Sequence, residues 1–480
     1  MQNRQIYIAD TNHGTILLSD CEKEVISTKL FNRLHHISQN STAYLTFPTN
    51  RTKRFEHSIG TMKLCGDIFY NAICNTSNDL IELLFTNIKK IIVNNIVDNE
   101  ILENADKYRS IIGDSKLKNN GEKLKEFKKY SLENIFYNRF IPQNLKEEYK
   151  LLYVILFQSI RLCGLLHDIG HPPFSHVTEY SINKIYRSLL EKNKASLTSR
   201  EKQYLEIIKD YDSGDGDFQL HEKMGIKMTK KLFSQIIFSG DINHLKLTFE
   251  EKMFKILVFE LTKLILLEKE GLESLHNIIS GTIDGDRLDY VNRDIENSGI
   301  DNGKIEYSRL ISSCKFSKLE IHDAEKIEVV YDSKTINTIE DFFTKRWYLY
   351  KNIINHHRVS KTDTILQNCV EMIIENYLSD TTIATELENN ILPDDISGLW
   401  LAIRLAHSNT EYFDSLIQWD DNWLITVLKK HYFRDYYEKE MSVSYMLEEF
   451  LSNKKNYYSI IKNNNDFKFF SSAFKNNIKF

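Results

Sequence analysis

The feature that most constrains this chain is its shortage of residues that interrupt helices. It has only 5 prolines and 17 glycines in 480 residues, and these residues are the strongest punctuation of local structure, so long helices are favoured. Apolar residues also recur at intervals of three and four. Within 251–279 they trace one helical face, made of Phe254, Leu257, Val258, Leu261, Leu264 and Ile265. Strand-like alternation is confined to 5–8 with 16–18 and to 327–331. The sequence therefore predicts a mainly α fold with small β elements.

Composition changes along the chain suggest how it is organised. Residues 76–150 are rich in Asn and Lys and separate two motif-bearing segments, which predicts an inserted helical segment, flexible near 111–128; a polar surface helix pair is the alternative. A loop is expected within 205–219, where the sequence reads YDSGDGDF. We predict a main domain over 1–380 and a helical, aromatic-rich C-terminal region over 381–480, acting as a cap or in oligomerisation.

Charge and cysteine usage exclude several classes of protein. The 62 Lys and Arg nearly balance the 67 Asp and Glu, which argues against a general nucleic-acid coat. The six cysteines form no C-x-x-C pair and no disulfide-like spacing. The N-terminus lacks the apolar core of a signal peptide, and the apolar stretch 151–166 is interrupted and is expected to be too short for a bilayer. We expect a reducing, cytoplasmic setting without a membrane.

The strongest chemical signal is the segment LLHDIGHPPFSH at 165–176. A long apolar helix delivers His167 and Asp168, and Gly170 with two prolines ends that helix at once. Adjacent helical residues point about 100° apart, so this pair converges on one ion only at a helix end. Imidazole and carboxylate suit divalent ions. The alternative is a run of capping and surface histidines, but only 15 histidines occur in the chain.

Two other segments carry candidate ligands. His57 opens a segment that reads as a buried helix, where a lone histidine is more often structural. In 284–294, Asp286, Tyr290 and Asp294 stack at i, i+4 and i+8 with Arg293 beside them. That face would present two carboxylates, a phenol and a cation, although an ordinary solvated helix face looks similar.

Together these segments resemble the HD superfamily of metal-dependent phosphohydrolases, whose motif order is H…HD…D. More narrowly, they resemble the deoxynucleoside triphosphate triphosphohydrolases, which include bacterial dGTPases and a vertebrate sterile-alpha-motif/HD protein. The narrower match rests on D-x-x-H-G-x-I at 10–16, F-N-R-L…I-S-Q at 31–39, F-P before R-F-E-H at 47–57, and H-P-P-F-S-H at 171–176. The similarity covers 1–75, 150–225 and 275–362, and implies a helical HD core.

The resemblance implies a divalent metal (Mg, Mn, Fe or Zn) and a set of catalytic groups. The metal ligands would be His57, His167, Asp168 and Asp286. The groups around the α-phosphate would be His171, His176 and His221. We assign proton donation to the leaving 5′-oxygen to His176, with Glu179 as its orienting partner, because a histidine titrates near neutrality.

The resemblance also implies a substrate site for a deoxynucleotide. Tyr290 and Asp294 would contact the deoxyribose, and Gln39 would approach its 3′-hydroxyl. The remaining substrate-binding residues would be Arg54 and Arg346, on the phosphates, and Tyr350. The chain departs from the family at Asn40-Ser41, where Leu-Gly is usual, at Ile354, where Tyr is frequent, and in the long interval from His57 to His167.

The expected reaction is hydrolysis of a dNTP to deoxynucleoside and triphosphate. The resemblance further implies a homo-oligomer, a tetramer or hexamer, that binds a regulatory dNTP, and family members include antiviral and phage-defence proteins. Two alternatives stay open. One is another HD enzyme, such as a nucleotidase, a cyclic-nucleotide phosphodiesterase or a hydrolase of hyperphosphorylated guanosine. The other is a nucleotide sensor that binds without turnover.

Overall fold

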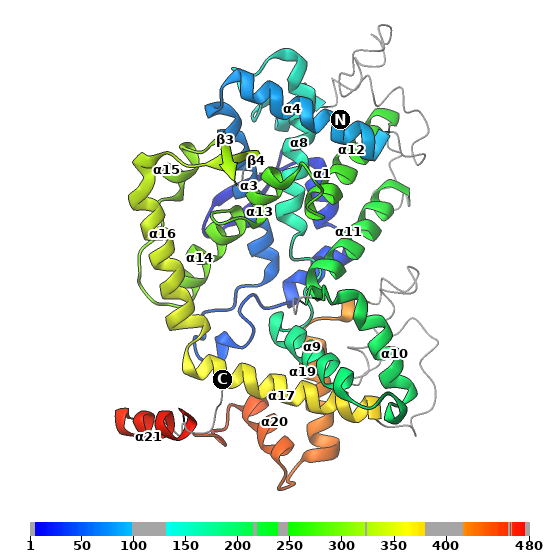
Figure 1. Ribbon diagram of the computed structural model, residues 1–480, viewed down its shortest axis with the longest axis vertical. Coiled ribbons are helices and arrows are strands. Elements are labelled where there is room, and N and C mark those ends of the chain that lie inside the picture. The colour runs from blue at the N-terminus through cyan, green and yellow to red at the C-terminus, as the bar shows by residue number, and fades with distance from the viewer. Residues whose placement is uncertain are drawn as a thin grey trace.

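The computed structural model describes residues 5–97, 131–214, 218–238, 248–321, 324–379, 416–458, 461 and 463–475. Over these ranges the chain is mainly helical, with two small two-stranded sheets. Figure 1 shows the helices stacked around a central pair, with the C-terminal helices at one end. The predicted mainly α class is confirmed.

The central pair is α3 (Arg54–Asn75) and α8 (Glu147–Leu166), which pack along each other. On them lie α12 (Phe249–Leu266) and α14 (Gly285–Asn297). Among the described residues, α8 alone is long and apolar enough to cross a membrane. The sequence analysis judged the apolar stretch 151–166 too short for this, but the helix begins earlier, at Glu147, and has 20 residues. Its apolar window is 94% buried within the protein, as expected for the core helix of a helical domain.

The two sheets are antiparallel hairpins. β1 (Ile6–Asp10) pairs with β2 (Gly14–Leu18), and β3 (Lys315–Ile321) pairs with β4 (Ala324–Val330). The strands predicted at 5–8, 16–18 and 327–331 are therefore present with shifted ends. The partner β3 was missed, because its sequence KFSKLEI alternates only weakly.

The remaining helices have the following bounds: α1 (Asp20–Ile26), α2 (Lys29–Asn32), α4 (Asn78–Ile92), α7 (Ile135–Asn138), α9 (His176–Glu191), α10 (Ser199–Ile208), α11 (Leu220–Phe238), α13 (Glu273–Ser280), α15 (Tyr307–Ser312), α16 (Ile336–Leu349), α17 (His357–Ser379), α19 (Asp421–His431), α20 (Ser442–Ser452) and α21 (Asn464–Lys475). The window 251–279 thus contains two helices rather than one. The chain turns between them, where Glu268 and Gly271 have positive φ.

The described part of 76–150 is helical and anchored to the core. α4 buries one apolar face, and its Phe85 ring meets Tyr149 at the start of α8 at 5.5 Å. The stretch predicted to be flexible, 111–128, lies outside the described residues. In the predicted 205–219 break, α10 and a short helical turn continue to Tyr211, so the irregular part is shorter than expected.

The C-terminal helices α19 and α20 belong to the same core. Leu424 and Leu428 of α19 and Leu447 of α20 are fully buried, and α20 packs on α17. All six cysteines are unpaired. The proposed boundary at 380 falls at the start of 380–415, which lies outside the described residues.

Candidate metal centre and cleft

The end of α8 presents the His-Asp pair. The helix stops at Leu166, His167 is its C-cap, and Asp168 follows in the turn. Gly170 makes this turn tight: a Cβ there would lie 2.0 Å from the carbonyl oxygen of His221 and 2.3 Å from the backbone nitrogen of Gly225. Only glycine therefore lets the start of α11 close over the end of α8.

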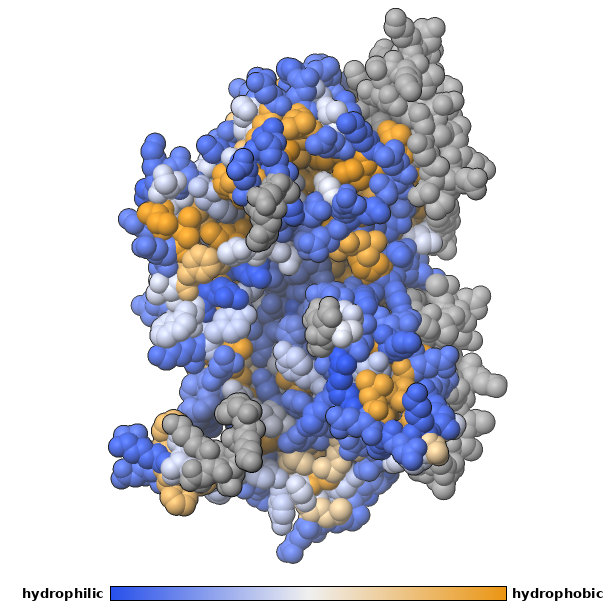
Figure 2. All heavy atoms as spheres, viewed as in Figure 1, coloured by the Kyte–Doolittle hydropathy of each residue, from blue (hydrophilic) through white to orange (hydrophobic). Residues whose placement is uncertain are grey.

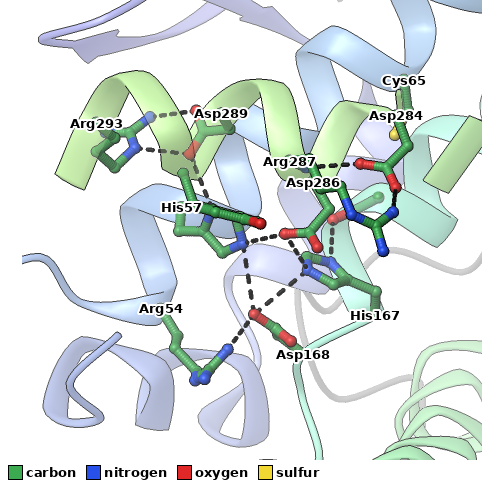
Figure 3. A network of polar contacts seen from close by, with 12 residues as sticks. Arg54, His57, Cys65, His167, Asp168, Asp284, Asp286, Arg287, Asp289 and Arg293 are labelled. Carbon is green, nitrogen blue, oxygen red and sulfur yellow. Dashed lines mark hydrogen bonds and ion pairs between the residues drawn. The ribbon is translucent and has the colours of Figure 1, made fainter. Parts of the chain in front are cut away.

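Four side-chain donors from three elements converge at this point (Figure 3). Asp286 Oδ1 lies 2.9 Å from His57 Nε2 and 3.5 Å from His167 Nε2. Asp168 Oδ2 lies 3.3 Å from His167 Nε2 and 3.5 Å from His57 Nε2. The four residues named as ligands from the sequence are thus brought together, on α3, the end of α8 and the first turn of α14.

Each histidine is held so that its Nε2 faces this point. His57 Nδ1 lies 2.8 Å from Asp289 Oδ2, and His167 Nδ1 lies 2.9 Å from the Gly164 carbonyl oxygen. Both Nε2 atoms are buried, and although carboxylate oxygens lie near them, none is placed with hydrogen-bond geometry, which is unusual for buried polar atoms. Imidazoles fixed through Nδ1 to a carboxylate or carbonyl are typical metal ligands.

The electrostatics favour positive charge at the same point. Burial alone would lower the pKa of His57, but its contacts with Asp286 and Asp289 outweigh this and raise the pKa to about 9. Burial alone would raise the pKa of Asp286, and His167 and His57 instead hold it well below its usual range. The donor set and its field therefore fit a divalent cation.

Behind His57 lies a buried ionic network that the sequence did not reveal. Asp289 accepts from Arg293 Nε at 2.8 Å and lies 2.6 Å from His13 Nε2, and Arg293 also pairs with Asp10 at 2.9 Å. The sequence placed Arg293 beside Asp286, Tyr290 and Asp294 as the cation of that helix face, but in the structure its guanidinium turns away to the carboxylates of Asp289 and Asp10. Two features of the sequence could have indicated this network. One is the i, i+4 spacing of Asp289 and Arg293, and the other is the D-x-x-H element, which contains Asp10 and His13.

A second cluster joins three histidines through one glutamate. The His171 and His221 rings stack at 4.1 Å, and His176 meets His221 edge-on at 5.3 Å. Glu179 lies 3.1 Å from His176 Nδ1 and 3.0 Å from His221 Nδ1. Glu179 therefore orients two histidines, not only His176. The ligand atoms of these four residues lie within 4.8 Å of one another.

Asp168 links the two clusters. Its Oδ2 faces the metal centre and pairs with Arg54, while its Oδ1 lies 3.2 Å from His171 Nε2. Burial and the Arg54 charge hold the pKa of His171 well below its usual range, so this ring is neutral near pH 7. Burial lowers the pKa of His221, but the bond to Glu179 outweighs burial and leaves it raised.

Both clusters open into one cleft of about 1110 Å³. Figure 2 shows a hydrophilic hollow at the centre of this face. The predicted site residues that line the cleft are Gln39, Arg54, His167, Asp168, His171, His176, His221, Asp286, Tyr290, Asp294, Arg346 and Tyr350. The two others, His57 and Glu179, are buried behind its wall.

The part of the cleft between α14 and α16 has the groups of a polar ligand site. Arg346 Nε donates to Tyr290 Oη at 3.1 Å, and its guanidinium lies 5.0 Å from the centre of the Tyr350 ring. Deeper in, Asp294 Oδ1 and Gln39 Oε1 are buried without a hydrogen-bond partner. Burial raises the pKa of Asp294 to about 6.

Comparison with known proteins gives distant relatives. No family model matches the chain. It is 24% identical over 76% of its length to an uncharacterized protein of Methanocaldococcus jannaschii, covering 49% of that protein. It is 23% identical over 52% of its length to a deoxyguanosinetriphosphate triphosphohydrolase-like protein of Listeria monocytogenes, covering 55% of it.

A third relative is a mimivirus protein named for its HD domain, 19% identical over 75% of this chain and 56% of the relative. The chain thus spans about half the length of the curated relatives it matches. Together with the paired His and Asp donors, these names support a relationship with the HD superfamily.

Proposed function

We propose that this chain is a metal-dependent triphosphohydrolase that converts dNTPs to deoxynucleosides and inorganic triphosphate. The observation that supports this most is the convergence of four donors beside a cleft that also holds three histidines: His167, Asp168 and Asp286 line the cleft, and His57 lies buried behind them. A divalent ion bound by these residues would activate water and offset charge on a phosphate.

The histidine cluster supplies the proton that the reaction needs. Cleavage between the α-phosphorus and the 5′-oxygen expels a poor leaving group, which must be protonated. Glu179 accepts from Nδ1 of His176 at 3.1 Å, so the ring would act as the doubly protonated imidazolium, which carries a second proton on Nε2 and would give that proton to the 5′-oxygen. His171, neutral and in contact with Asp168, would lie beside the α-phosphate and keep the two clusters together.

The unpartnered acceptors support a hydroxylated ligand. Asp294 Oδ1 and Gln39 Oε1 are acceptor atoms without a partner, and a sugar hydroxyl is a donor that would satisfy them. On α14, Tyr290 lies one turn after Asp286 and one turn before Asp294. Arg346, held beside Tyr290 and Tyr350, would bind the phosphates, with Arg54 close to the α-phosphate.

One observation favours a second candidate. The four groups of the histidine cluster are close enough to chelate a cation themselves, and two ions about 4 Å apart are the arrangement of many phosphodiesterases. The chain would then be a two-metal HD nucleotide phosphohydrolase or phosphodiesterase. A metal content of two ions per chain at saturation would favour it over the triphosphohydrolase.

The test is chromatography of the products after incubation with each dNTP and NTP, with Mg²⁺ or Mn²⁺, beside an Asp286→Asn control. Release of triphosphate and deoxynucleoside supports the proposal. Release of orthophosphate or pyrophosphate contradicts it. Thermal stabilisation by dNTPs without any product would instead identify a nucleotide sensor.

We also propose, from the resemblance alone, a tetramer or hexamer regulated by a dNTP in the cytoplasm, where lowering dNTP pools would limit phage or viral replication. Mixed dNTPs should then stimulate turnover beyond any single one. Light scattering that shows a monomer at every nucleotide concentration contradicts this assembly.

A further inference from the structure

The loop from α8 to α9 carries strained backbone at its end, in the two residues before α9. This loop, 169–176, contains His171 and delivers His176 as the first residue of α9. Phe174 and Ser175, neither of them glycine, have φ of +55° and +53°. Residues with side chains rarely adopt such angles, and they persist only where the surroundings hold them. The contacts that hold this loop therefore bear on the catalytic histidines.

A carboxylate from the far end of the chain makes the first of these contacts. Asp421, at the start of α19 and 247 residues from Phe174, accepts the Phe174 N–H at 2.7 Å. Its other oxygen accepts the Ser38 N–H at 2.8 Å. Asp421 is only 3% exposed. A buried carboxylate shared by two backbone donors makes strong, charge-assisted bonds, so it fixes both loops together.

Arg33 makes a second tie between the C-terminal region and the same loop. Its guanidinium donates to the carbonyl oxygens of Ile169, of His171 at 2.9 Å and of Trp419 at 2.8 Å. The side chain of Phe174 makes a third, because its ring meets Phe450 of α20 edge-on at 5.8 Å. Three contacts of different kinds thus join the C-terminal region, through Trp419, Asp421 of α19 and Phe450 of α20, to the loop.

The loop in turn sets groups on the cleft wall. Ser175 Oγ donates to the Ser38 carbonyl at 2.8 Å and accepts from Arg54 Nε at 2.8 Å, and Arg54 pairs with Asp168. We propose that Asp421, acting through the Phe174 N–H, is a positioning residue that places His176 and makes the C-terminal region part of the catalytic unit. The effect on turnover rests on the proposed function.

Asp421→Asn in the full-length chain tests this, with Asp420→Asn as the matched control. The two N–H groups bond to different oxygens of the carboxylate, and in the amide one of these oxygens becomes an NH2 donor, so one N–H group loses its acceptor. Asp420 instead caps α19 by accepting the Trp423 N–H at 2.9 Å, and Asn caps equally well. Deuterium exchange of the peptide that spans 169–176 is followed by mass spectrometry, together with kcat and KM on a dNTP.

We expect Asp421→Asn to speed exchange in 169–176 and to lower kcat about 10- to 100-fold with little change in KM, as for a displaced catalytic group. Asp420→Asn should leave both near wild type. Added to His176→Ala, Asp421→Asn should cause no further fall in kcat, because both changes remove the same contribution.

Three outcomes would overturn the proposal. The deuterium exchange of 169–176 could be unchanged in Asp421→Asn, or Asp420→Asn could change exchange and kcat equally, or the two losses in kcat could multiply in the double variant. If the wild-type chain turns over no dNTP, the proposed function fails, and the exchange measurement alone still decides whether Asp421 holds the loop. Should Asp421→Asn not fold, Asp421→Ser replaces it, since the smaller side chain leaves room for water at the two N–H groups.

Discussion

Asp289 Oδ2 lies 2.8 Å from His57 Nδ1, and this contact turns the His57 Nε2 toward Asp286. Asp289→Asn weakens the anchor because a neutral amide holds the ring less firmly and makes Nε2 a poorer ligand. We expect the Kd for Mn²⁺ to rise about 10- to 100-fold, the usual effect of losing such a partner. Isothermal titration measures it.

The control for this variant is Glu82→Gln, which removes an exposed carboxylate paired with Lys146 on the surface. It should leave the Kd unchanged. Equal Mn²⁺ affinity in Asp289→Asn and the wild type, with both folded by circular dichroism, would show that Asp289 only supports the packing.

Asp286→Asn should abolish stable metal binding, because it removes a carboxylate that lies 2.9 Å from His57 Nε2 and 3.5 Å from His167 Nε2. The wild-type chain should bind one divalent ion, measured by elemental analysis after gel filtration. Circular dichroism should be unchanged, since this side chain is 29% exposed and supports little packing. Full metal content in the variant would place the ion elsewhere.

His176→Ala should lower kcat on a dNTP by roughly 10²- to 10⁴-fold, the range for a positioned general acid. Metal content and substrate affinity should change little, because His176 stands in the second cluster. A p-nitrophenyl ester, whose leaving group needs no proton, should lose much less. His221→Ala is the matched variant, since Glu179 holds both rings alike. The general acid is the histidine whose loss lowers kcat on a dNTP far more than kcat on the p-nitrophenyl ester.

Asp294→Asn should stabilise the protein at neutral pH while reducing turnover. Burial raises the pKa of Asp294 from 3.8 to about 6. Between these values the folded state binds a proton that the unfolded state has lost, so stability falls as pH rises through this window. Because Asn does not titrate, the Asp294→Asn variant lacks that fall. At pH 7 its free energy of unfolding should therefore exceed that of the wild type by on the order of 1–3 kcal/mol.

Thermal melts from pH 4 to pH 8 measure this difference, which should grow from about pH 4 to about pH 6 and level off by pH 7. Asp301→Asn, at an exposed carboxylate, should show no such trend. A constant difference across the whole range would mean that Asp294 does not titrate there.

The sequence was sufficient to place a residue where its position depends only on neighbours within one short segment. His167 and Asp168 were placed at a helix end because Gly170 and two prolines follow them, and α8 does end there. The i, i+4, i+8 spacing of Asp286, Tyr290 and Asp294 placed them on one helix, which is α14. In both cases the structure is set by residues within one or two turns.

Tertiary contacts account for what sequence did not reveal. Arg293 follows Asp286 by seven residues, so around the helix axis its Cα lies only about 20° from that of Asp286. Its long side chain nevertheless leaves this helix face and reaches Asp289 and Asp10. The role of Asp421 depends on a partner 247 residues away. Apolar spacing likewise identified the buried face over 251–279 but not the turn after Leu266, since periodicity alone marks no ends.

The convergence of distant segments has a consequence for how the protein matures. His57 leaves the ribosome long before Asp286, so a nascent chain has only an incomplete set of donors until α14 emerges. The loop before His176 forms its hydrogen bond from the Phe174 N–H still later, after Asp421 has been synthesised. Since chains are made at about 5–20 residues per second, the four donors of the candidate metal centre could come together only after residue 286 has been made, and a chain terminated before α14 would lack one of them.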